Sequence, residues 1–185
     1  KSRQMVLPRQ FLRQCRTCLF RLKVADSSGA ELTGGRLLTG TLAFKRLLER
    51  EIISDEEEMV GLLLPPSAGA VIANTSLALM RKVAVNLNYT LSAEVMNFCI
   101  KDCGIRKVLT SRAFMEKRPF EPDEAELVYL EDLSEQVTGF DKLIGILQSK
   151  LLPAGLLDKI HGLERIEWDD LMTIIFTSGS TGDPK

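Results

Sequence analysis

Residues 177–185, near the end of the chain, carry the residue types that hold phosphate groups. They read TSGSTGDPK. Gly179 and Gly182 let backbone N–H groups approach an anion closely, and Lys185 supplies a compact positive charge. Hydroxyl groups that can donate hydrogen bonds stand at Thr177, Ser178, Ser180 and Thr181. The stretch therefore predicts a phosphate-binding loop.

Two familiar nucleotide-binding templates do not fit this stretch. A Walker-type loop places its lysine directly after a glycine, whereas here Asp183 and Pro184 separate Gly182 from Lys185. The dinucleotide fingerprint requires a third glycine, which is absent from the stretch. A kinase-like ATP binder is thus disfavoured, and an ordinary Gly/Ser/Thr turn is the remaining structural alternative.

The segments before the loop alternate between apolar strand patterns and helical patterns. Predicted strands cover residues 59–64, 82–87, 106–110, 126–130 and 170–176, the last being a buried strand that leads into the loop. Predicted helices cover residues 35–50, 67–80, 93–102 and 140–152, with Ser67 and Ser92 as N-caps and Gly104 as a helix end. Short connections and continuously apolar strands predict an α/β fold, with a layered, mostly parallel sheet and helices on both faces.

Composition and charge indicate a globular protein. The 185 residues are 45% hydrophobic and 26% charged, and the net charge of −1 argues against a general nucleic-acid surface. Residues 1–25 form a basic lead-in, for which a solvated helix face is favoured over contact with anionic lipid or a partner. The uncharged window 59–80 has the length of a membrane span, but Pro65 and Pro66 interrupt it, so a strand followed by a helix is predicted.

The loop and the segments before it resemble the adenylate-forming (AMP-forming) ligase superfamily. Its signature is usually TSG[ST]TGxPKG, which residues 177–185 match up to the lysine. Residues 59–111 resemble the part of such ligases that precedes the loop, with Asn86-Leu87-Asn88 and Asp102-Cys103-Gly104 at the corresponding turns. Residues 26–38 resemble the opening hairpin and helix. Within the superfamily, the sequence of residues 83–111 is most similar to that of bacterial acyl-acyl carrier protein synthetases joined to 2-acylglycerophosphoethanolamine acyltransferases.

This resemblance implies that residues 1–185 are the N-terminal portion of a larger AMP-binding ligase domain. Such an enzyme uses ATP and Mg²⁺ to activate a carboxylic acid, here a fatty acid, as an acyl-adenylate. It then passes the acyl group to an acyl carrier protein or coenzyme A. The loop would hold the β- and γ-phosphates through Thr177, Ser178, Gly179, Ser180, Thr181 and Gly182, with Lys185 nearby.

The same resemblance places the catalytic residues downstream of Lys185, so the chain alone is expected to be inactive. It also implies a cytoplasmic parent, with peripheral membrane contact as a further expectation. A non-catalytic α/β phosphate-binding module is the alternative from a different class.

The cysteines and the single histidine do not predict a metal-binding or catalytic site in addition to the loop. Four thiols at Cys15, Cys18, Cys99 and Cys103 match the number of ligands in a zinc site. Cys99 and Cys103 stand four apart on one helix face, so packed thiols are the favoured interpretation. His161 is predicted at a loop or helix end and Trp168 as a packing residue at the last strand.

Overall fold

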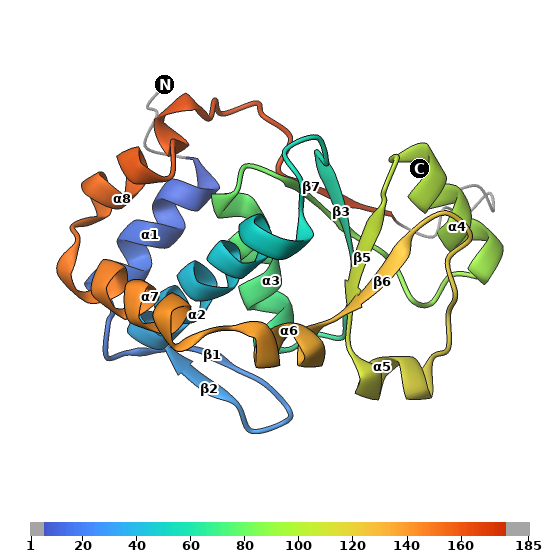
Figure 1. Cartoon of the computed structure of the whole chain (residues 1–185), viewed down its shortest axis with the longest axis horizontal. Helices are drawn as coiled ribbons and strands as arrows, with labels where there is room; N and C mark the ends of the chain where they lie inside the picture. The colour runs from blue at the N-terminus through green and yellow to red at the C-terminus, as the bar shows by residue number, and fades with distance from the viewer. Residues whose placement is uncertain (1–5, 177–185) are drawn as a thin grey trace.

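The computed structural model describes residues 6–176 and contains a five-stranded, fully parallel sheet (Figure 1). The strands lie in the order β6-β5-β3-β4-β7. Their bounds are β3 (Met59–Leu63), β4 (Val83–Asn86), β5 (Lys107–Thr110), β6 (Glu126–Tyr129) and β7 (Thr173–Ile175). The predicted α/β fold with a parallel sheet is therefore confirmed.

Alternate residues of the central strands enter two different cores, because successive side chains of a strand point to opposite faces. Val60 and Leu62 of β3 belong to one apolar cluster, which α3 (Ala68–Leu79) covers. Leu63 belongs to the other, which α4 (Ala93–Asp102) and α5 (Arg112–Lys117) cover. Both faces of β3 are thus buried, which explains its unbroken apolar sequence.

The predicted helix ends are confirmed by their hydrogen bonds. The Ser67 hydroxyl accepts a bond of 3.1 Å from the backbone N–H of Ala70, and Ser92 accepts one of 3.4 Å from Val95. Gly104 follows α4 with φ of +60°, a conformation that glycine adopts without steric cost. The uncharged window 59–80 is β3 followed by α3, as predicted.

A layer of helices packs outside α3, on the left-hand side of Figure 1. It comprises α1 (Leu7–Thr17), α2 (Gly34–Leu47), α7 (Gly139–Leu151) and α8 (Ala154–Ile160). The predicted hairpin is present as β1 (Leu22–Ala25) and β2 (Glu31–Thr33), and it leads directly into α2. Residues 6–176 contain no helix with the length and apolar character needed to span a bilayer.

The sequence favoured a solvated helix face for the basic lead-in segment. In the structure, the segment also makes contacts with other helices. Its arginines hold α1 to the neighbouring helices. The Arg9 side chain donates a hydrogen bond of 2.7 Å to Asp158 of α8, and Arg16 donates one of 3.0 Å to the carbonyl oxygen of Lys150 in α7. Leu12 and Cys15 of α1 are buried in the core of the helical layer.

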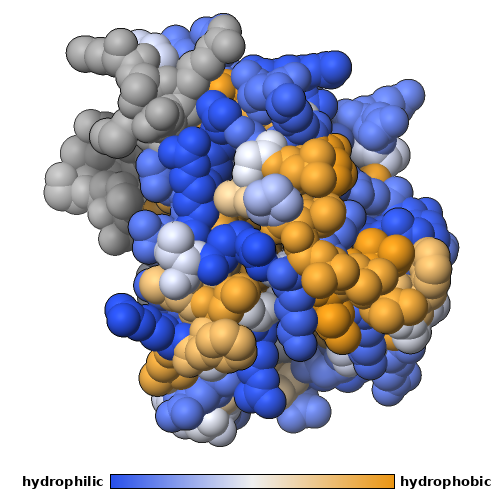
Figure 2. All heavy atoms as spheres, turned by 90° about the vertical axis from the view of Figure 1, so that its left-hand side faces the viewer, coloured by the Kyte–Doolittle hydropathy of each residue, from blue (hydrophilic) through white to orange (hydrophobic). Residues whose placement is uncertain are grey.

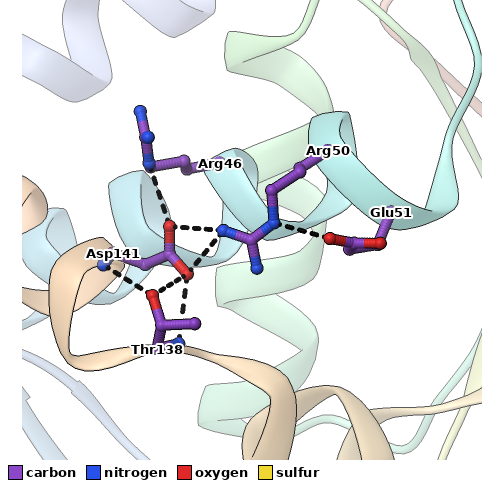
Figure 3. Close-up of polar contacts among 5 residues, drawn as sticks. All are labelled: Arg46, Arg50, Glu51, Thr138 and Asp141. Atoms are coloured by element: carbon purple, nitrogen blue, oxygen red, sulfur yellow. Dashed lines mark hydrogen bonds and ion pairs between the residues drawn. The ribbon is translucent and has the colours of Figure 1, made fainter.

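A buried carboxylate joins α7 to the end of α2 (Figure 3). Asp141 is fully buried and accepts hydrogen bonds of 2.9 Å from both Arg46 and Arg50. Thr138 and Asp141 also form a reciprocal capping box at the start of α7. Burial opposes the charge on Asp141, but hydrogen bonds from Thr138 and Arg50 outweigh it and lower its pKa to about 2.

Several predicted elements differ from those observed. The helix predicted over residues 35–50 ends as a π-helical turn, η2 (Leu48–Ile52). Three short helices were not predicted, namely α5, α6 (Leu130–Gln136) and α8, and a short 3₁₀ turn, η3 (Leu163–Arg165), follows α8. Trp168 is 77% exposed, so its predicted packing role is wrong.

Candidate functional site

The candidate site lies at the carboxyl edge of the sheet. β7 pairs with β4 in parallel, with Thr173 opposite Ala84 and Ile175 opposite Asn86. Both strands therefore end at the same edge, where ligands bind in open α/β sheets. Phe176 is the last residue that the structure describes, and the predicted phosphate loop, residues 177–185, begins one bond beyond it.

The predicted loop residues themselves lie outside the described part of the chain. They are Thr177, Ser178, Gly179, Ser180, Thr181, Gly182, Asp183, Pro184 and Lys185. Their proposed contacts with phosphate stay a prediction. What the structure does show is the frame from which the loop starts.

Side-chain hydrogen bonds fix β7 in this frame. Thr173 donates through its hydroxyl to the carbonyl oxygen of Ala84 at 2.8 Å and accepts from the Asn86 amide at 3.1 Å. Asn86 in turn exchanges two amide hydrogen bonds with Asn74 of α3, at 3.2 and 3.3 Å. The side-chain hydrogen bonds from Asn74 through Asn86 to Thr173 thus form one polar chain. It links α3, β4 and β7, the strand that leads to the loop.

The two sides of β7 are buried to different extents. Phe176 is 8% exposed and packs in the cluster under α4, whereas Ile175 is 64% exposed. The prediction of a buried last strand is therefore wrong for the α3 side of β7. Within residues 6–176, β7 is an edge strand that pairs with β4 alone, so no second strand covers its outer side.

A groove of about 740 Å³ opens at the same edge of the sheet. Its lining includes the Pro65-Pro66-Ser67 turn after β3, together with Asp26, Asn74 and Asn86. The groove therefore borders the polar chain that anchors β7.

Asp26 ties the hairpin to this groove. One carboxylate oxygen accepts a bond of 2.8 Å from the backbone N–H of Ala68, at the start of α3. The other accepts bonds from Ser28 and Ala30 within the hairpin turn. Hydrogen bonds from Ser28 and Ala68 lower the Asp26 pKa to about 2, so the carboxylate is charged at neutral pH.

Asn74 and Asp26 were not singled out by the sequence interpretation. Asn74 does carry a signal, because it begins a run of three polar residues, with Thr75 and Ser76, inside a helix that is apolar on either side of the run. Asp26 reads as a plain turn residue in the sequence, since its partner Ala68 lies 42 positions away and contributes only a backbone group.

The four cysteines are free thiols, and three of them lie in cores. Cys15 is buried in the helical layer, while Cys99 and Cys103 pack in the cluster under α4, as predicted for packed thiols. Burial raises the pKa of Cys15 to about 11, whereas a hydrogen bond with Thr17 lowers the pKa of Cys18. Among residues 6–176, no three His, Cys, Asp or Glu side chains are grouped so as to hold a metal ion.

His161 caps the end of α8, in agreement with its predicted place at a helix end. Its Nε2 atom is buried and, within the described residues, has no hydrogen-bond partner. Burial and the nearby Lys45 lower the pKa of His161 to about 4, so the ring is neutral at pH 7. The ring lines a small cavity together with Lys45 of α2 and Lys82, which directly precedes β4.

Comparisons with solved structures show the same fold. O-succinylbenzoate coenzyme A synthetase (MenE) from Bacillus subtilis, in complex with AMP, has a TM-score of 0.69 at 20% identity, over 95% of this chain and 40% of that one. VinN in complex with 3-methylaspartate has a TM-score of 0.71 at 20% identity, over 97% and 46%. The N-terminal subdomain of Klebsiella oxytoca NpsA has a TM-score of 0.70 at 16% identity, over 97% and 40%.

The chain thus spans less than half the length of these solved structures. MenE has also been solved with ATP and magnesium ion, with a TM-score of 0.63 at 20% identity over 95% of this chain and 41% of that one. The family model described as AMP-binding enzyme matches residues 13–185, which include nearly every described element and the whole loop. By this match, the chain belongs to the AMP-binding enzyme family.

Proposed function

We propose that the chain is the N-terminal part of an ATP-dependent, AMP-forming acid–thiol ligase. The observation that carries the proposal is that β7 ends at the carboxyl edge of a parallel sheet, directly before the glycine- and hydroxyl-rich loop. That placement suits a nucleotide phosphate, because the ligands of such sheets bind outside the carboxyl ends of the strands. The family match over residues 13–185 supports the same activity.

In the proposed reaction, a carboxylate attacks the α-phosphorus of ATP, and acyl-adenylate and pyrophosphate result. Negative charge on the phosphates is met by oriented N–H groups, hydroxyls and a lysine. These donors would be Thr177, Ser178, Gly179, Ser180, Thr181, Gly182 and Lys185. When bound, Mg²⁺ supplies further charge neutralisation at the phosphate oxygens. The polar chain through Asn86 and Thr173 would hold the start of the loop in place.

For the substrates, we propose a fatty acid as the carboxylic acid and an acyl carrier protein or coenzyme A as the thiol. This finer proposal is supported by the similarity of residues 83–111 to bacterial acyl-acyl carrier protein synthetases. A cytoplasmic location of the parent enzyme belongs to the same proposal. A non-catalytic phosphate-binding module is the competing function, and it predicts ATP binding without chemistry.

The test is ATP–pyrophosphate exchange by the full-length ligase that contains this chain. Thr181→Ala and Lys185→Ala are each expected to lower the exchange rate by about a hundredfold, the typical effect of removing one preorganised donor. Thr17→Ala and Lys117→Ala, at exposed positions on α1 and α5, are the matched controls and should leave the rate unchanged. If exchange is undiminished in both loop variants, the loop has no part in the reaction.

A further inference from the structure

The outer face of α7 is apolar, although its inner face contains polar residues. Asp141, Gly145 and Ser149 recur every four residues and are buried against the neighbouring helices. On the outside, Leu143, Leu147 and Leu151 are 50%, 41% and 69% exposed. Globular helices normally place apolar residues inward. The pattern on α7 is therefore reversed, and its apolar side is exposed within residues 6–176.

The apolar face continues from α7 onto α8. We call it the α7–α8 face and define it by exposed large apolar side chains: Phe140, Leu143, Ile146, Leu147, Leu151, Leu156 and Ile160. Figure 2 views this side of the molecule and shows apolar side chains gathered in a contiguous area. Monomeric soluble proteins rarely expose such large apolar areas unless the area binds a partner or a membrane.

The exposed charges of the α7–α8 face are all positive. Lys142, Lys150 and Lys159 are exposed, and none of them pairs with a carboxylate among residues 6–176. The only acids between residues 139 and 159 are Asp141 and Asp158, and both are buried and ion-paired with arginines. The face therefore combines apolar side chains with unneutralised lysines.

We propose that the α7–α8 face docks on an anionic membrane surface. Apolar side chains beside lysines suit the boundary between lipid headgroups and acyl chains, where the lysines reach the phosphates. A second copy of the chain is a poorer occupant, because a two-fold contact would place the lysines of one copy near those of the other. The proposal concerns a surface formed by α7 and α8 and is independent of the proposed ligase activity.

The test is sedimentation of the 185-residue chain with lipid vesicles. The chain should bind vesicles of phosphatidylcholine that contain phosphatidylglycerol and bind pure phosphatidylcholine far more weakly. Each lysine near an anionic surface contributes roughly a fivefold factor in affinity, so replacing Lys142, Lys150 and Lys159 by Gln should weaken binding on the order of a hundredfold. Leu143→Gln with Leu147→Gln should also abolish most of the binding.

Matched control substitutions are available elsewhere on the surface. Leu22→Gln on β1 and Phe98→Gln on α4 change residues that are 53% and 54% exposed but lie outside the face, and they should leave vesicle binding unchanged. Circular dichroism and thermal unfolding establish that every variant is folded. The proposal is overturned if the chain does not bind anionic vesicles, or if the control variants lose as much vesicle binding as the face variants. It is also overturned if the only effect of the face variants is to dissociate a dimer in analytical ultracentrifugation.

Discussion

At the scale of single residues, His161 has a strongly shifted pKa, and the shift affects the stability of the fold. It is the only histidine in the chain, and its pKa is lowered from 6.5 to about 4 by burial and by Lys45. Lys45 is itself buried and forms an ion pair with Glu49. Protonation of His161 is therefore less favourable in the folded chain than in the unfolded chain.

The free energy of unfolding should accordingly depend on pH through His161. Because its folded-state pKa is the lower one, the stability contribution is complete above pH 6.5 and is lost as pH falls towards 4. We expect a loss of roughly 3 kcal/mol across that window. Urea unfolding at a series of pH values measures it, and in His161→Gln the loss over the same window should be smaller. Parallel pH curves for the two proteins would contradict the prediction.

Residue-level prediction from sequence succeeded where the decisive partner is local in sequence. The caps of Ser67 and Ser92 contact backbone groups three residues away, so spacing alone reveals them. The environment of His161 depends on Lys45, which is 116 positions distant, and nothing in the local pattern indicates it. The prediction of a packing role for Trp168 was wrong for a similar reason, since the exposure of this side chain depends on segments that are distant in sequence.

At the scale of elements, the close packing of α7 on α2 depends on Gly145. A Cβ atom at this position would lie 2.9 Å from the carbonyl oxygen of Thr39 and 3.4 Å from Ala43. The backbone oxygen cannot rotate away as a side chain could. Any larger residue therefore pushes the two helices apart.

We expect Gly145→Ala to lower the free energy of unfolding by about 1–3 kcal/mol, despite the better helix propensity of alanine. Gly155→Ala on α8 is the matched control, because an added Cβ there meets nothing within 4 Å. That change should be neutral or raise stability by up to about 1 kcal/mol. Chemical denaturation of both variants measures the difference, and equal effects would show that the α2–α7 contact tolerates the methyl group.

The sequence predicted the long and strongly apolar elements well. β3, β4 and β5 are buried on both faces, so apolar residues make up most of each strand and stand out in the sequence. The three missed helices have six or seven residues each, too few for a helical period to be visible. The apolar sequence of residues 171–176 did predict β7, but burial depends on neighbouring strands and could not be read from it.

At the scale of the whole molecule, the chain matches only part of each solved structure of the same fold. It spans 40–46% of the length of the solved structures reported above. We expect weak or no ATP binding and no ATP–pyrophosphate exchange by the 185-residue chain alone. The assay uses the full-length ligase as the positive control, and measurable exchange by the shorter chain would contradict the prediction.

The open outer side of β7 has a practical consequence for handling the chain. Within residues 6–176, the outer side of β7 pairs with no strand and Ile175 is exposed, and an edge of this kind is the usual site of intermolecular strand addition. Precipitation during purification would begin at this margin of the sheet. A charged side chain in place of Ile175 would act as a gatekeeper and keep concentrated samples soluble.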